Sequence, residues 1–257
     1  MTQTERLTYL IKYLLSENNE LSSIDIPEKD AEKKRLLRSL MNIRPPKTAS
    51  RDFLEAQDAY LQEECIKKGV ISLSDIPTVQ PGIYLWQGDI TRLSADAIVN
   101  AANSTMLGCF VPCHGCIDNA IHSAAGIELR LECSRIMQKQ KTEEPTGKAK
   151  ITKAYHLPCR YILHTVGPII YETVTEKDCN LLSDCYRSCL ELAAAYQLKS
   201  IAFCCISTGE FHFPHEKAAK IAVQTVQDYQ KKNQNGLEVV FNVFKDIDYE
   251  IYKQLLE

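Results

Sequence analysis

An unbroken apolar segment, Ile-Ala-Phe-Cys-Cys-Ile, occupies residues 201–206. Such a segment is typical of a strand buried on both faces of a sheet, which requires helices on each side. Other short β-rich runs, at 83–86, 97–99, 154–157, 161–164 and 238–243, are separated by stretches with helical periodicity at 117–137, 181–196, 216–231 and 247–256. This alternation predicts an α/β sandwich with a largely parallel central sheet.

The first 76 residues have a different character from the rest of the chain. Leu7, Leu10, Ile11 and Leu14 share one face of a helix expected over residues 5–16. Apolar residues at 36–41 indicate a second helix, which should end before Pro45-Pro46, and a third helix should run to about Gly69. The segment carries no chemical motif. We therefore expect residues 1–76, the helical extension, to pack on a main domain at 77–257.

Charge and cysteine usage restrict the class of protein. The net charge is -3 and no strongly basic segment is present, which argues against nucleic acid as the main partner. No secretory signal and no apolar run long enough to span a bilayer occur, so no membrane is expected. Eleven cysteines in a chain of this size, without a signal, indicate reduced thiols in a cytoplasmic protein.

The densest chemistry lies in residues 108–116, here named the cysteine loop. It contains Cys109, Cys113, His114 and Cys116, and thiolates and imidazoles are the ligands that zinc prefers. All four could close a structural tetrahedron, whereas three would leave an open position for catalysis. Neighbouring side chains in an extended loop point in opposite directions, so Cys113 and His114 are poorly placed to bind the same ion.

Polar residues flank the cysteine loop on both sides. Asn100 and Asn103 close the preceding strand, and Asp118 and His122 lie one helical turn apart in the following helix. The helix dipole favours a carboxylate at the position of Asp118. A loop between a strand and a helix is where open α/β sheets bind ligands.

Five segments together give a family resemblance: 88–91 (GDIT), 96–104 (DAIVNAANS), 121–126 (IHSAAG), 155–168 (YHLPCRYILHTVGP) and 200–214 (SIAFCCISTGEFHFP). Over about residues 82–245 the chain resembles a macrodomain, the ADP-ribose-binding fold. This implies a three-layer α/β/α macrodomain with a mixed, largely parallel sheet. The cysteine loop replaces the usual run of glycines, and in this respect the chain is similar to zinc-dependent macrodomains, which also have a helical extension.

The resemblance implies a role for each site residue. Zinc would be held by Cys109, His114 and Cys116, and Asp118 would be catalytic together with Asn103, which holds the distal ribose. Substrate contacts would come from Asp89 and Ile90 at the adenine, and from Asn100, Asn103, Ser207, Thr208, Gly209, Glu210 and Phe211. Gly209 would let the backbone approach a phosphate, and Phe211 would lie against the distal ribose. Among the other histidines, His122 is expected to support the site and His164 to be structural.

The resulting prediction is a zinc-dependent hydrolase that removes mono-ADP-ribose from modified, acidic side chains of proteins. Similarity to the microbial, sirtuin-associated members implies as substrate a lipoyl-carrier protein modified by a sirtuin-type transferase. The alternative is a reader module that binds ADP-ribose without turnover and uses zinc only to hold the loop. The cysteine loop and Asp118 together favour the hydrolase over the reader.

Overall fold

A computed structural model describes residues 1–233 and 236–257. Its main sheet has seven strands in the order β2-β3-β9-β8-β5-β7-β6. The five central strands are parallel: β3 (Ile83–Gln87), β9 (Glu238–Val243), β8 (Ser200–Phe203), β5 (Ala97–Ala101) and β7 (Tyr161–Thr165). The edge strands β2 (Thr78–Gln80) and β6 (Ala149–Lys153) are antiparallel to their neighbours. The predicted mixed, largely parallel sheet is confirmed.

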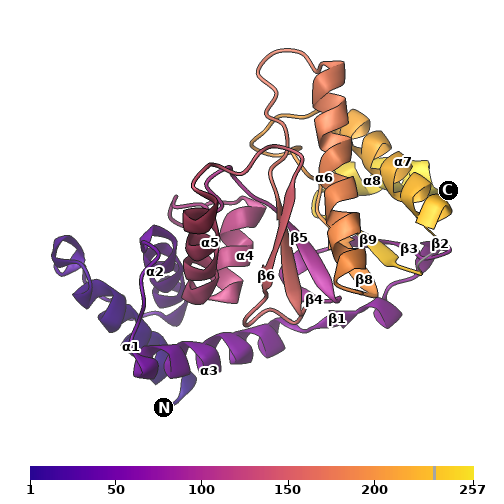
Figure 1. The fold of residues 1–257 in the computed structure, drawn as a ribbon. Coiled ribbons are helices and arrows are strands. Elements are labelled where there is room, and N and C mark those ends of the chain that lie inside the picture. The colour runs from indigo at the N-terminus through magenta and orange to yellow at the C-terminus, as the bar shows by residue number, and fades with distance from the viewer. Residues whose placement is uncertain (234–235) are drawn as a thin grey trace.

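Helices cover both faces of this sheet (Figure 1). One layer holds α4 (Ile117–Ala125) and α5 (Ile127–Gln140), and the other holds α6 (Glu176–Ala195), α7 (His215–Asn233) and α8 (Asp246–Leu256). The β8 strand is buried throughout, as its apolar sequence requires. Thr175 and Asp178 form a capping box that begins α6. The three-layer architecture is therefore as predicted.

Two elements differ from the prediction. The helix expected over 117–137 is divided between α4 and α5 at Gly126, which has φ 96°, and a Cβ there would lie 2.9 Å from the Gln57 amide. The prediction of a strand at 154–157 is wrong. Those residues form a turn closed by Leu157 N donating to Ala154 O, with Tyr155 at φ 53°, and the strand is instead β6.

The helical extension contains α1 (Gln3–Ser16), α2 (Asp30–Ile43) and α3 (Arg51–Lys68), together with the short 3-10 turn η1 (Asn19–Leu21). Thr2 and Ser50 cap α1 and α3 with their side chains. The apolar faces of the three helices form their own cluster, joined by Ile127 of α5. Helices α2 and α3 contact α4, so the extension lies beside the α4 and α5 layer (Figure 1).

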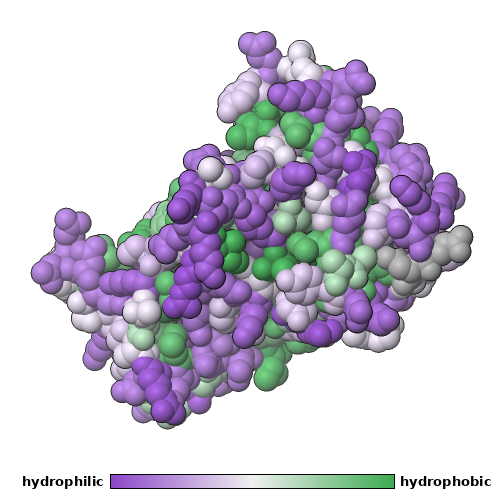
Figure 2. Space-filling view, in the orientation of Figure 1, coloured by the Kyte–Doolittle hydropathy of each residue, from purple (hydrophilic) through white to green (hydrophobic). Residues whose placement is uncertain are grey.

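Short elements join the extension to the sheet. The β1 strand (Ile71–Ser72) pairs in parallel with β4 (Leu93–Ser94), and the 3-10 turns are η2 (Leu73–Asp75) and η3 (Ile90–Arg92). The face shown in Figure 2 is mostly hydrophilic, with apolar side chains in small separate groups. Within residues 1–233 and 236–257, no helix combines the length and the apolar character that crossing a membrane requires.

Candidate active site

A cleft of about 870 Å³ opens at the carboxyl ends of β3, β5, β8 and β9. The chain leaves β5 toward α4 on one face of the sheet and leaves the adjacent β8 toward α7 on the other. Adjacent parallel strands whose connections diverge in this way leave a crevice between their ends, which is the usual ligand site of open α/β sheets. Most of the lining residues come from the segments that follow these four strands.

Cys109, His114 and Cys116 lie together on one side of this cleft. Their ligand atoms all lie within 4.8 Å of one another, and Cys109 Sγ is 3.7 Å from His114 Nδ1. Sulfur and nitrogen on a tetrahedral zinc, at about 2.3 and 2.1 Å from the metal, lie about 3.6 Å apart. Burial raises the pKa of the Cys116 thiol to about 12, so a thiolate there requires a cation beside it. The donor set and its spacing fit zinc.

Cys113 belongs to a different environment. Its backbone has φ 52°, and its Sγ lies 3.2 Å from Ser39 Oγ and 3.4 Å from Arg35 O, both in α2. The thiol therefore faces the helical extension, away from the other three ligands. Of the four candidate ligands in the cysteine loop, the geometry therefore brings three together.

Asp118 is 5% exposed and lies in the first turn of α4, at the wall of the cleft. Its Oδ1 accepts a hydrogen bond of 2.8 Å from Asn100 Nδ2, and its Oδ2 accepts one of 3.3 Å from Asn103 Nδ2. Burial raises the pKa of Asp118 to about 6, against the lowering effects of the Asn100 hydrogen bond and of Arg130. The two amides thus fix both carboxylate oxygens.

Two buried histidines lie behind Asp118. His122 Nε2 is 3.5 Å from Asp118 Oδ1, and burial lowers the pKa of His122 well below its ordinary value. His164 Nδ1 lies 3.1 Å from Asn100 Nδ2 and its Nε2 lies 2.9 Å from Thr152 Oγ1, while burial lowers its pKa to about 3. Burial therefore favours the neutral form of both rings. His164 holds Asn100, and Asn100 holds Asp118.

Asp89 and Ile90 line the opposite end of the cleft, after β3. Asp89 Oδ1 accepts hydrogen bonds from Thr91 N and Thr91 Oγ1, at 3.0 and 2.7 Å, and so caps η3. Its other oxygen, Oδ2, lies 3.8 Å from Lys68 Nζ at the end of α3. One carboxylate oxygen therefore holds the turn, while the second is available as an acceptor at the wall of the cleft.

The loop after β8, residues 207–211, forms the floor between these two ends. Among the residues that the structure describes, the backbone N–H groups of Gly209, Glu210 and Phe211 donate no hydrogen bond. The loop is closed around them by His212 N donating to Gly209 O and by Phe213 N donating to Ser207 O. Successive free N–H groups form a concavity that binds anions. A Cβ on Gly209 would meet nothing within 4 Å, so this surface is open.

The structure brings nearly all the predicted site residues to this one cleft. The exception is Asn100, which is fully buried and lies behind Asp118, so its predicted direct contact with substrate does not fit its position. Arg38, Asn242, Phe244, Lys245 and Asp248 also line the cleft, although no sequence motif predicts a role for them. Arg38 comes from the helical extension, Asn242 lies in β9, and the other three follow β9.

Known proteins similar to this chain identify its family. The family model of the Macro domain matches residues 99–222. The chain is 55% identical over 260 residues to a protein-ADP-ribose hydrolase of Treponema medium, covering 100% of both chains. It is 47% identical over 251 residues to a protein-ADP-ribose hydrolase of Staphylococcus aureus, covering 97% of this chain and 94% of that one. A Trypanosoma brucei macrodomain in complex with ADP-ribose has a TM-score of 0.68 and 30% identity, covering 86% of this chain and 95% of that one.

Proposed function

Because the chain belongs to the Macro domain family, we propose that it is a hydrolase that removes ADP-ribose from modified proteins, the activity for which its relatives are named. The observation that carries the proposal is Asp118, a buried carboxylate fixed by two amides at the cleft wall beside the cysteine loop. A module that only binds ADP-ribose gains nothing from a carboxylate held in this way. A hydrolase needs one to receive a proton from water.

ADP-ribose would lie along the cleft with its adenine near Asp89. The exposed Oδ2 of Asp89 accepts a hydrogen bond from the adenine amino group, which discriminates against bases that lack it. The free N–H groups of residues 209–211 bind the pyrophosphate. The distal ribose then reaches Asn103, Phe211 and the cysteine loop, with its C1″ atom near Asp118.

Several residues at the distal-ribose end of the cleft contribute to the chemical step. Asp118 accepts a proton from a water as that water attacks C1″, and the carboxylate of the modified side chain leaves. Asn100 and Asn103 keep the two oxygens of Asp118 in place, and Asn103 also contacts the loop through Gly108 O at 3.2 Å. Cys109, His114 and Cys116 would hold a zinc ion, which supplies Lewis acidity and orients the ribose. The Glu210 carboxylate lies 3.7 Å from His114 Nε2, where it orients that ring.

Finer parts of the proposal concern the substrate and the compartment. The resemblance to zinc-dependent macrodomains supports an ester link to an acidic side chain, on a protein such as a lipoyl-carrier protein modified by a sirtuin-type transferase. We also propose that the protein works in the cytoplasm. All eleven cysteines are free, which suits a reducing compartment.

The test is release of ADP-ribose from proteins carrying a single modification on a glutamate, an arginine or a serine, with zinc measured on the same sample. The proposal predicts about one zinc per chain and turnover of the glutamate-linked substrate. Cys116→Ala and His114→Ala should lose the metal and most of the activity. Tight binding of ADP-ribose without release from any of the three substrates would instead establish a reader.

A further inference from the structure

Helix α2 of the helical extension holds the backbone of the cysteine loop. Arg38 Nη2 donates to His114 O at 2.9 Å, and the same guanidinium donates to Asn119 Oδ1 through Nε and Nη2, at 3.1 and 2.7 Å. Asn42 follows Arg38 by four residues in α2, and its Oδ1 accepts a hydrogen bond of 2.9 Å from Cys113 N. The two residues therefore fix consecutive backbone positions, 113 and 114, of which the second carries the imidazole ligand.

Asn42 is itself held rigidly. It is 1% exposed, and its Nδ2 donates to Ser123 Oγ at 2.9 Å, on α4. Arg38 likewise reaches α4 through Asn119, whose Nδ2 donates to Val111 O in the loop at 2.9 Å. Hydrogen bonds from both α2 and the first turns of α4 thus hold the loop between these two helices.

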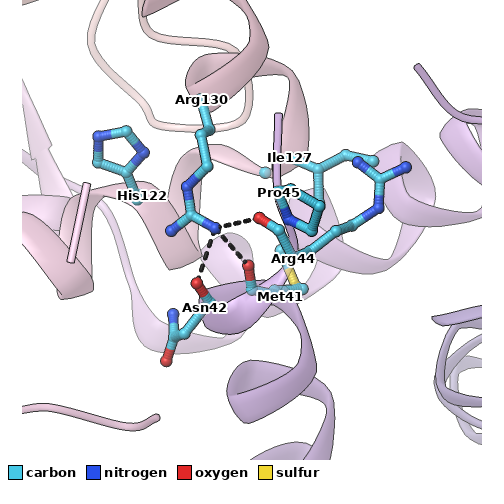
Figure 3. Close-up of a pocket in the computed structure, with 8 residues that line it drawn as sticks. Met41, Asn42, Arg44, Pro45, His122, Ile127 and Arg130 are labelled. Carbon is cyan, nitrogen blue, oxygen red and sulfur yellow. Dashed lines mark hydrogen bonds between the residues drawn. The ribbon is translucent and has the colours of Figure 1, made fainter. Parts of the chain in front are cut away.

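A buried arginine ties the end of α2 to the beginning of the loop. Arg130 of α5 is 4% exposed, and its Nη1 donates to Met41 O, Asn42 O and Arg44 O at 3.0, 2.7 and 2.6 Å (Figure 3). The last carbonyls of a helix have no partner within it, and a cation is favoured there. The other side of the guanidinium donates to Leu107 O at 2.6 Å and to Cys109 O at 3.4 Å.

These contacts fix the conformation of a loop that has no regular secondary structure of its own. Residues 104–116 contain no helix or strand. Metal ligands must be held to within a fraction of an ångström, and the groups that orient them typically change metal affinity by about 10–100-fold. In this chain those groups come from the helical extension, through Arg38 and Asn42, and from Arg130.

We infer that α2 is an integral part of the metal-binding half of the site, and that Arg38 and Asn42 are positioning residues for His114 and its neighbours. The inference rests on the proposed function, because it assumes that the cysteine loop binds zinc. It goes beyond that function in making the helical extension a component of the site. A role in stability alone predicts a different result, because the folded variants would then bind zinc as the wild type does.

The experiment compares Arg38→Ala and Asn42→Ala with Arg6→Ala. Arg6 is a matched control: it lies in the same extension and pairs with Glu63 at 2.9 Å, between α1 and α3, without contacting the loop. Zinc affinity is measured by competition with a chromogenic chelator, and the ligand geometry by the visible spectrum of the Co²⁺-substituted protein. Thermal unfolding confirms that each variant is folded.

Arg38→Ala and Asn42→Ala should each weaken zinc binding by about 10–100-fold and alter the Co²⁺ spectrum, while Arg6→Ala matches the wild type. Asn42→Asp retains the acceptor for Cys113 N and should recover most of the affinity. Wild-type affinity and spectrum in both folded alanine variants would overturn the inference while leaving the proposed hydrolase intact. A wild type that binds no zinc would overturn the inference and the metal part of the proposed function together.

Discussion

Replacing Arg130 with methionine should destabilise the protein strongly, although the two side chains are similar in length. The guanidinium donates to carbonyl oxygens of Met41, Asn42, Arg44, Leu107 and Cys109, and it lies 4.2 Å from the centre of the Phe110 ring. A hydrogen bond to a charged group contributes about 1.5–3 kcal/mol. The sum over all these bonds overstates the effect, because burying the guanidinium has its own penalty.

Removing one partner of a buried charged network costs about 3–5 kcal/mol, because the remaining polar groups lose their partners. For a chain of this size, 1 kcal/mol shifts the melting temperature by about 2–4 °C, so we expect a fall of about 10 °C. The melting temperature of Arg130→Lys should lie between those of the wild type and Arg130→Met, since one ammonium group cannot reach all the carbonyls. The assay is thermal unfolding monitored by circular dichroism, supported by urea unfolding to obtain the free energy.

Arg51→Met is the control for this prediction. Its side chain is 90% exposed and pairs with Glu55 one turn along α3, a type of ion pair that contributes less than about 0.5 kcal/mol. A melting temperature for Arg130→Met as close to wild type as that of Arg51→Met would refute the reasoning that Arg130 binds the extension to the cysteine loop.

Two further predictions concern ligand binding. Asp89→Asn keeps the oxygen that caps Thr91 but can turn an NH₂ group toward the adenine amine. Calorimetry should therefore show that the affinity for ADP-ribose falls by about 5–100-fold, while the stability of the protein is unchanged. An affinity equal to that of the wild type would remove Asp89 from adenine recognition. A Cβ on Gly209 would meet no atom within 4 Å, so the stability of Gly209→Val should stay within about 0.5 kcal/mol of wild type. Its affinity for ADP-ribose should nevertheless fall about tenfold or more, because the added side chain occupies the approach of the phosphates; unchanged affinity would place the pyrophosphate elsewhere.

The sheet and its layers could be predicted because burial leaves a direct trace in the sequence. The apolar run of β8 has no polar residue to place on an exposed face, so it had to be a central strand. The division of α4 from α5 left no such trace. It depends on Gly126 packing against Gln57 of the extension, which also accepts a hydrogen bond from Ile127 N at 3.0 Å. The strand β6 was missed because its lysines resemble a loop, although an edge strand tolerates them.

Residues of the cleft could be predicted where they carry a chemical group in a recognisable segment, as Asp89, Asp118, Cys109, His114 and Cys116 do. The position of Asn100 could not be predicted, because it follows from the register that pairs Asn100 with His164 across β5 and β7. Side chains at paired positions lie on the same face, and here that face is directed to the buried side of Asp118. Arg38 and Arg130 act through backbone carbonyls and amides distant in sequence, which no local pattern reveals.

The central claim is that this cleft hydrolyses the bond to ADP-ribose and that Asp118 serves the chemical step. Single-turnover release of ADP-ribose from a glutamate-linked, mono-ADP-ribosylated protein tests it most directly, in wild type and in Asp118→Ala, with affinity for free ADP-ribose measured on the same preparations. We expect the rate to fall by about 10²–10⁴-fold, with affinity changed only about threefold. Hydrolysis by Asp118→Ala at the wild-type rate would contradict the account.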